Sequence, residues 1–228
     1  ANRKKTYKWI HPDVHFSFPV VKLDDKKREE TTSDDFLPQW RTALASNPFM
    51  TISQWQNYIH ATTKPNINTK ECNDIIQKLA YQAFGSGPKV LLMWMPEYLG
   101  KEGNKLLKLI EEPTDNTYLI LVAVEQNKIL NTILSRCQLM KFMPYSLEDL
   151  EAYIIEKFGI EKSIANQYAR LSEGNLSMAI SLAKEGEKDL STNLFNWLRT
   201  SYKGDAEEIQ SFVLEFTSQN LDHQIQFV

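Results

Sequence analysis

Two continuous apolar runs lie in the middle of the chain, at residues 89–95 (KVLLMWM) and residues 117–124 (TYLILVAV). Neither run alternates with polar residues, which is typical of strands that are covered on both faces in a parallel sheet. Residues 14–21 (VHFSFPVV) carry an apolar side chain at every second position, and this alternation predicts a further strand. The patterns together predict a sheet with buried strands.

Helical spacing of apolar residues predicts helices between and after these strands. Asn68 is expected to begin a helix, with Glu71 three residues later in a capping-box pattern, and a Gly-Ser-Gly-Pro sequence ends it. Residues 103–112 form a second helical pattern, which Pro113 stops. Further helices are predicted at residues 35–45, 51–60, 129–134, 147–158, 162–172, 175–185, 189–202 and 205–219.

The order of these elements predicts the α/β fold class, with a partial parallel-sheet domain followed by helices only. We place the sheet domain at residues 1–143 and a small helical domain at residues 144–186. Residues 187–228 are expected to be the start of a further, all-helical domain. Residues 144–146 (Pro-Tyr-Ser) then form a hinge between the first two domains.

Composition excludes several classes of protein. The net charge is −3, with 42% hydrophobic and 24% charged residues, so the chain as a whole is no basic nucleic-acid binder. No apolar run reaches membrane-spanning length, and the two cysteines are too few for a disulfide framework or a four-cysteine zinc site. We expect a cytoplasmic protein without a membrane partner, a metal or a cofactor. The alternative is a metal held by His11, His15 and Cys72.

A Ser135-Arg136-Cys137 triplet follows a short helical pattern and precedes another apolar run. An arginine at a helix end can project its planar set of donors across a subunit boundary. Alternatively, Arg136 pairs within its own chain, with Glu111, Glu112 or a backbone carbonyl group. Cys137 leads an apolar run and has no histidine near it in the sequence, which favours a structural thiol over a nucleophile.

The order L-L-K-x-x-E-E-P, apolar strand and T-I-L-S-R-C, over roughly residues 88–142, resembles the AAA+ subunits of sliding-clamp loaders. This resemblance implies an AAA+-type sheet domain, a helical lid and the beginning of a helical collar domain. It also implies that residues 24–62 are a possible insertion, and that Arg136 is an arginine finger placed against ATP in the neighbouring subunit. The residues expected to support this motif are Ser135, Cys137, Glu111, Glu112 and Pro113.

The positions at which this resemblance places a nucleotide site lack the required chemistry. Trp94 and Met95 stand where relatives carry the acidic pair of a Walker B motif, and neither can ligate magnesium or accept a proton. Glu97 falls on the later acidic position of the family, or is simply an exposed carboxylate in a turn. No G-x-x-x-x-G-K-[ST] phosphate loop is found in the sequence. We therefore predict a degenerate site without intrinsic ATPase activity.

This combination is similar to the delta-prime subunits of bacterial DNA polymerase III clamp loaders, which complete a ring and act in DNA replication. The partners implied are an ATP-binding neighbour and a delta-type subunit, with the sliding clamp and primer–template DNA contacted indirectly. One alternative is an active AAA+ ATPase whose phosphate loop lies in a segment before Ala1.

A second alternative comes from His11-Pro12-Asp13, which follows a basic stretch and resembles the J-domain of co-chaperones. In J-domains this tripeptide lies in a loop between two helices. Here a strand-like sequence follows Asp13, which favours a turn that leads into a strand.

Overall fold

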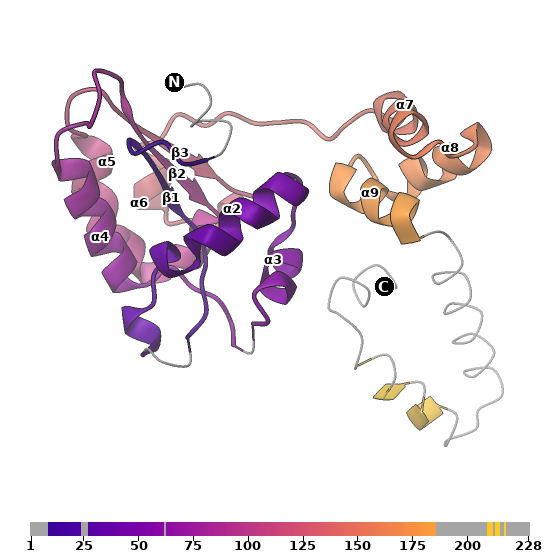
Figure 1. Cartoon of the computed structure of the whole chain (residues 1–228), viewed down its shortest axis with the longest axis horizontal. Coiled ribbons are helices and arrows are strands. Elements are labelled where there is room, and N and C mark those ends of the chain that lie inside the picture. Colours follow the sequence, from indigo (N-terminus) through magenta and orange to yellow (C-terminus); the bar gives the residue numbers. More distant parts are fainter. Residues whose placement is uncertain are drawn as a thin grey trace. The chain divides into compact units, whose positions relative to one another are not determined.

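The computed structural model consists of two compact units, Ala1–Met140 and Lys141–Val228, and each has a hydrophobic core of its own (Figure 1). The first unit contains strands and helices, whereas the described part of the second contains helices only. The structure describes residues 9–23, 27–61, 63–185, 209–211, 213, 214 and 217. The predicted α/β fold class, with a sheet domain followed by helices, is confirmed.

A three-stranded parallel sheet forms the centre of the first unit. Its strands are β1 (Val14–Ser17), β2 (Lys89–Trp94) and β3 (Thr117–Val122), in the order β1-β2-β3. All three predicted strands are present, but β1 ends before the predicted residue 21. The reason is Pro19, which has no N–H group to donate to a sheet. Val20 instead forms an isolated antiparallel bridge with Asn66.

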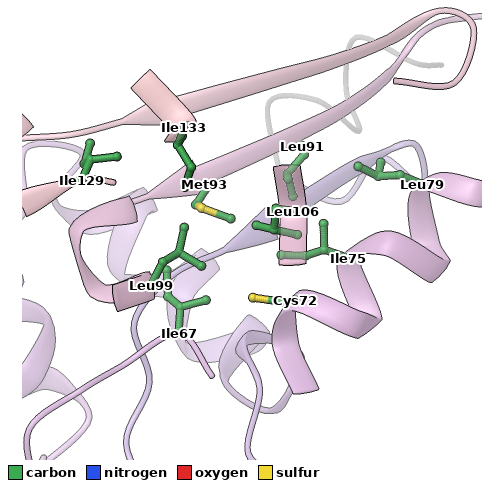
Figure 2. Packing of buried hydrophobic residues seen from close by; sticks show 10 residues of the cluster. All are labelled: Ile67, Cys72, Ile75, Leu79, Leu91, Met93, Leu99, Leu106, Ile129 and Ile133. Atoms are coloured by element: carbon green, nitrogen blue, oxygen red, sulfur yellow. The ribbon is translucent and has the colours of Figure 1, made fainter. Parts of the chain in front are cut away.

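Helical elements that lie before and after β2 in the sequence cover one face of the sheet. They are α4 (Thr69–Ala80), the 3₁₀ helix η3 (Pro96–Leu106), α5 (Leu107–Glu111), the 3₁₀ helix η4 (Gln126–Lys128) and α6 (Asn131–Leu134). Figure 2 shows side chains of α4, η3 and α6 converging on Leu91 and Met93 of β2. Asn68 caps α4 as predicted, because its side-chain oxygen accepts the backbone N–H of Glu71 at 2.9 Å.

The helix predicted at residues 103–112 is only partly correct. The helical segment begins earlier, at Pro96, and only Leu107–Glu111 is α-helical. Proline suits the first position of a helix, because its missing N–H would have no partner there. Gly100, at φ 51° and ψ −136°, then interrupts the helical backbone.

A second helical layer covers the other face of the sheet at β1 and β2. It contains the 3₁₀ helices η1 (Arg28–Glu30) and η2 (Ser33–Phe36), and the helices α2 (Leu37–Ser46) and α3 (Ile52–Tyr58). Aromatic rings fill its core: Trp40 stacks on Phe18 with ring centroids 4.1 Å apart, and Trp55 meets Trp40 edge-on at 5.1 Å. The described part of the possible insertion at residues 24–62 therefore packs as a layer of the sheet domain.

The expectation that residues 117–124 are covered on both faces is wrong for the part of the chain that the structure describes. Leu119 and Leu121 of β3 pack into the first core, but Tyr118, Ile120 and Val122 are 58%, 48% and 42% exposed. These three alternate residues share one face of the strand. β3 is an edge strand, and the aromatic core of the second layer contains residues of β1 and β2 but none of β3.

The described helices of the second unit are α7 (Leu147–Phe158), α8 (Lys162–Leu171) and α9 (Leu176–Glu185), close to their predicted ranges. Ser146 caps α7, and its hydroxyl oxygen accepts the N–H of Asp149 at 3.1 Å. Gly174, at φ +83°, precedes α9 and accepts a hydrogen bond from the N–H of Tyr145 at 3.1 Å. The predicted helix at 189–202 and the predicted boundary at 186/187 lie outside the described residues, as does most of the predicted helix at 205–219.

Candidate functional site: the surface around Arg136

Helix α6 positions the Ser135-Arg136-Cys137 triplet at the surface of the first unit. Ile133 of α6 is 1% exposed and anchors the helix in the core. A Cβ at Gly103 would lie only 2.8 Å from Cδ1 of Ile133, so the end of the Ile133 side chain packs directly against this glycine. The N–H of Arg136 donates to the carbonyl oxygen of Ile133 at 3.0 Å, which continues the helical turn. The backbone of Arg136 is therefore fixed by a helix that is held in the core.

The side chain of Arg136 makes three contacts within the first unit. Its Nε donates to Oε1 of Glu111, and its Nη1 donates to the carbonyl oxygen of Thr132 at 2.8 Å and to Oγ of Ser135 at 3.3 Å. The side chains of Arg136 and Glu111 are 34% and 45% exposed. The pairing that the sequence left open, with Glu111 and a carbonyl group, is thus present, and the guanidinium group still lies at the surface.

The other motif residues take different positions. Glu112 is exposed, and its backbone N–H donates to the carbonyl oxygen of Lys108 at 3.0 Å, which closes α5 just before Pro113. No hydrogen bond or ion pair joins the Glu112 carboxylate to Arg136 within the described residues. Cys137 is half-buried against the first core, and burial raises the pKa of its thiol. A raised pKa opposes a nucleophilic role, in agreement with a structural thiol.

Trp94 and Met95 lie at the carboxyl end of β2, where both side chains pack rather than point into solvent. The ring of Trp94 lies 5.0 Å from that of Trp40. Met95 is 7% exposed, has the left-handed φ of 57°, and donates its N–H to the carbonyl oxygen of Val122 at 2.9 Å. Neither position offers a carboxylate.

Glu97 was expected either at an acidic position of the family or as an exposed turn carboxylate, and the second interpretation is wrong. Its Oε1 accepts the backbone N–H groups of Val124 and Glu125 at 2.5 and 2.6 Å. Its Oε2 is buried and has no hydrogen-bond partner within the described structure. Glu97 therefore holds the chain just after β3. Sequence reasoning missed this contact, because the partners are 27 and 28 residues away.

The tripeptide His11-Pro12-Asp13 forms a turn that leads directly into β1, so the J-domain interpretation is wrong. Asp13 is 4% exposed, and its carboxylate accepts the backbone N–H groups of Phe84 at 2.6 Å and of Gly85 at 3.1 Å. These bonds tie the start of β1 to the loop after α4. The role of the tripeptide in this chain is structural.

Lys89 is 5% exposed at the start of β2, next to the only Gly-x-Gly sequence of the chain. Its ammonium group donates to the carbonyl oxygen of Leu79, to that of Tyr81 at 2.8 Å, and to Oγ1 of Thr114 at 2.8 Å. An ammonium group has three donors, and all three are used here. Lys89 is therefore a structural residue, with no donor left for a phosphate.

A buried carboxylate that the sequence did not reveal joins the second helical layer to α4. Glu71 is 2% exposed and accepts the backbone N–H of Ser33 at 2.8 Å and its hydroxyl at 2.5 Å. Burial raises the pKa of Glu71. The sequence offered only its place in the capping pattern of α4, since Ser33 lies 38 residues away.

Neither a metal cluster nor a membrane span is found in the part of the chain that the structure describes. No three residues among its His, Cys, Asp and Glu lie close enough together to hold a metal ion. Cys72 is buried, and burial raises the pKa of its thiol to about 12. None of the described helices combines the length and apolar character needed to cross a bilayer.

Comparison with solved structures gives distant similarities. One is to a DNA polymerase III gamma subunit-related protein of Thermotoga maritima MSB8, with 16% identity and a TM-score of 0.43, over 83% of this chain and 50% of that chain. Another is to a variant of RuvB from Thermotoga maritima, with 20% identity and a TM-score of 0.42, over 53% of this chain and 43% of that chain.

Sequence comparisons are more specific. The chain is 32% identical to DNA polymerase III subunit delta' of Bacillus subtilis (strain 168) over 37% of its length, and 26% identical to the Haemophilus influenzae subunit delta' over 72%. The matched parts span 25% and 51% of these two relatives. A profile described as "DNA polymerase III, delta subunit" matches residues 4–146, more than half of the chain, and bears out the resemblance to delta-prime subunits of clamp loaders. The chain therefore belongs to this DNA polymerase III, delta subunit family.

Proposed function

We propose that this chain is part of a non-catalytic AAA+-like subunit of the DNA polymerase III sliding-clamp loader, and that Arg136 acts in trans on ATP bound by the neighbouring subunit. The surface position of the Arg136 guanidinium at the end of α6 carries this proposal. A guanidinium group at a subunit edge can stabilise the charge that develops on a transferring phosphoryl group. Membership of the family and the names of the delta' relatives support the same assignment.

The non-catalytic part of the proposal depends on the carboxyl end of β2. Hydrolysis of ATP needs carboxylates for magnesium and for the attacking water. At this end of the sheet Trp94 and Met95 are packed hydrophobic residues, and the nearby Glu97 carboxylate is bonded to two backbone N–H groups. We therefore assign no ATP turnover to this subunit and treat the site as a degenerate Walker B motif.

The proposed partners are other subunits of the loader. Relatives of this chain also include DNA polymerase III subunit tau of Bacillus subtilis (strain 168), at 29% identity over 49% of this chain. An ATP-binding neighbour would receive Arg136, and a delta-type subunit would complete the ring. Contact with the sliding clamp and primer–template DNA would then be indirect. The proposed location is the cytoplasm.

The proposed domain order follows the same assignment. Residues 1–143 would form the partial AAA+-like domain with the insertion at 24–62, and residues 144–186 the lid. Residues 187–228 would begin the helical collar.

Replacing Arg136 by alanine in the full-length protein tests this function. The variant is assembled with its partner subunits, and DNA-stimulated ATP turnover is measured. Loss of an arginine finger lowers turnover at the site that uses it by about a thousandfold, so the total rate should fall by the share of that site. Arg170→Ala, which removes an exposed arginine of α8, is the matched control and should leave turnover unchanged.

Two results would contradict the proposal. Unchanged turnover in the Arg136→Ala complex would remove the finger function. Hydrolysis of ATP by the full-length protein without partners would remove the non-catalytic assignment.

A further inference from the structure

Two flanks of the Arg136 guanidinium are held by acceptors of its own chain. On one flank the Nε–H donates to Oε1 of Glu111. On the other flank Nη1 donates to the carbonyl oxygen of Thr132 at 2.8 Å and to Oγ of Ser135 at 3.3 Å. Acceptors at both Nε and Nη1 therefore restrain the orientation of the guanidinium group.

The contacts of Arg136 within its own chain leave some of its N–H donors unused. A guanidinium group has five N–H donors, one on Nε and two on each terminal nitrogen. The contacts above use Nε and Nη1, and no acceptor among the described residues bonds to Nη2 of Arg136. With the side chain 34% exposed, Nη2 is the part of the group that can bind an acceptor from outside the chain. A phosphate oxygen suits such a donor.

Glu111 is itself placed by a rigid element. It is the last residue of α5, which packs against α6. Leu107, Leu109 and Ile110 of α5 pack against the first core and hold the helix in place. The position of the carboxylate is therefore set by the core, whereas Ser135 and Thr132 lie on the same short helical turn as Arg136.

We propose that Glu111 is a positioning residue for Arg136. Its carboxylate fixes the guanidinium group through Nε, so that Nη2 is presented to a phosphate oxygen of the nucleotide in the neighbouring subunit. This inference depends on the proposed function and names the residue that gives the finger its orientation. Catalytic groups that are held in place before the reaction lose less freedom in the transition state, and small displacements of such groups slow the reaction.

Exposed ion pairs often contribute little, so the role of Glu111 has to be separated from a passive surface contact. The loader is assembled with full-length protein carrying Glu111→Ala, Arg136→Ala or both, and the kcat and KM of its DNA-stimulated ATPase are measured. We expect Glu111→Ala to lower kcat at the affected site by about fivefold and to leave KM unchanged. In the Arg136→Ala background the same substitution should have no further effect, because Glu111 acts through Arg136.

Two further variants complete the test. Glu156→Ala removes an exposed carboxylate of α7, outside the Arg136 motif, and should leave kcat unchanged. Glu111→Gln keeps a side-chain oxygen that can accept from Nε without the charge, and it should restore part of the lost rate. A merely structural role of Glu111 would instead lower turnover by the same factor with or without Arg136.

The outcomes separate this inference from the proposed function. An unchanged or raised kcat in Glu111→Ala, with a strongly reduced kcat in Arg136→Ala, would refute the positioning role and leave the finger intact. An equal loss from Glu111→Ala in both backgrounds would refute it as well. An Arg136→Ala complex with normal turnover would refute the proposed function and this inference with it.

Discussion

Replacing the buried Glu71 should change the free energy of unfolding by an amount that follows from its contacts. Its carboxylate is buried between α4 and the 3₁₀ helix η2, where both oxygens bond to Ser33. Glu71→Ala would leave the Ser33 backbone N–H without a partner and open a cavity. An unpaired buried donor costs about 1–3 kcal/mol, and the loss of the buried methylene and carboxyl groups adds to this. We expect the free energy of unfolding to fall by about 2–4 kcal/mol.

Glu71→Gln is expected to behave differently, because of the hydrogens available at Ser33. The Ser33 hydroxyl has a single hydrogen, but Oε1 of Glu71 lies at 2.5 Å and the carbonyl oxygen of Phe16 at 3.0 Å. A hydrogen on Glu71, or the amide of a glutamine, could donate to Ser33 Oγ and free the hydroxyl for Phe16. The glutamine oxygen could still accept the Ser33 N–H. Glu71→Gln should therefore match or exceed the wild-type stability at pH 7.

The buried carboxylate of Glu71 also makes the stability of the protein depend on pH. Burial raises the pKa of Glu71, and the hydrogen bonds from Ser33 oppose this rise. The folded protein therefore keeps a proton at pH values where the unfolded chain has lost it. The stabilising contribution is complete below the ordinary carboxyl pKa of 4.5 and is lost as the pH rises through the raised pKa. Glutamine cannot titrate, so the stability of the Glu71→Gln variant should not show this dependence on pH.

Urea denaturation at about four pH values between roughly 4 and 8 measures the free energy of unfolding of each variant and its dependence on pH. Intrinsic fluorescence reports on the first unit through Trp40, Trp55 and Trp94, which lie in its aromatic core. Glu112→Gln removes an exposed carboxylate and should reproduce the wild-type curve. If Glu71→Gln loses stability with rising pH as the wild type does, then the pH dependence does not come from Glu71 and the reasoning is refuted.

Two further predictions concern the second unit and the thiols. Gly174→Ala should destabilise the second unit by about 1–3 kcal/mol in thermal denaturation, because the residue has φ +83° and a Cβ would meet Pro144. Gly159→Ala, in the same unit at φ +67° and ψ 23° with open space around it, should cost less, and equal losses would contradict the role of the close contact. Burial raises the pKa of the Cys72 thiol to about 12, so Cys72 should resist alkylation by iodoacetamide at about pH 8 until the protein unfolds. Mass spectrometry follows the alkylation. The half-buried Cys137 should react sooner, and rapid native labelling of Cys72 would contradict its burial.

Local pattern was sufficient to predict most of the elements. A strand or helix side chain points to a face that is set by its position in the sequence, so periodicity indicates the element and the side available for burial. Asn68 and Ser146 were readable as caps for the same reason, since a cap and its N–H partner lie three residues apart. The Ser135-Arg136-Cys137 triplet was singled out by its resemblance to clamp-loader subunits, and the helical pattern before it predicted that it follows a short helix. Its place at the end of α6 agrees with that prediction.

Contacts between distant residues were decided only by the tertiary structure. The sequence left open whether Arg136 pairs with Glu111, Glu112 or a carbonyl group, and packing of α5 against α6 selects Glu111 and the carbonyl of Thr132. The bonds from Glu97 to the chain after β3, and from Glu71 to Ser33, join residues that no local spacing relates. Apolar character shows that a strand can be buried on both faces, but the neighbours of that strand decide whether it is. The exposed face of β3 is the clearest case, because strand order and the reach of the second helical layer are properties of the whole fold.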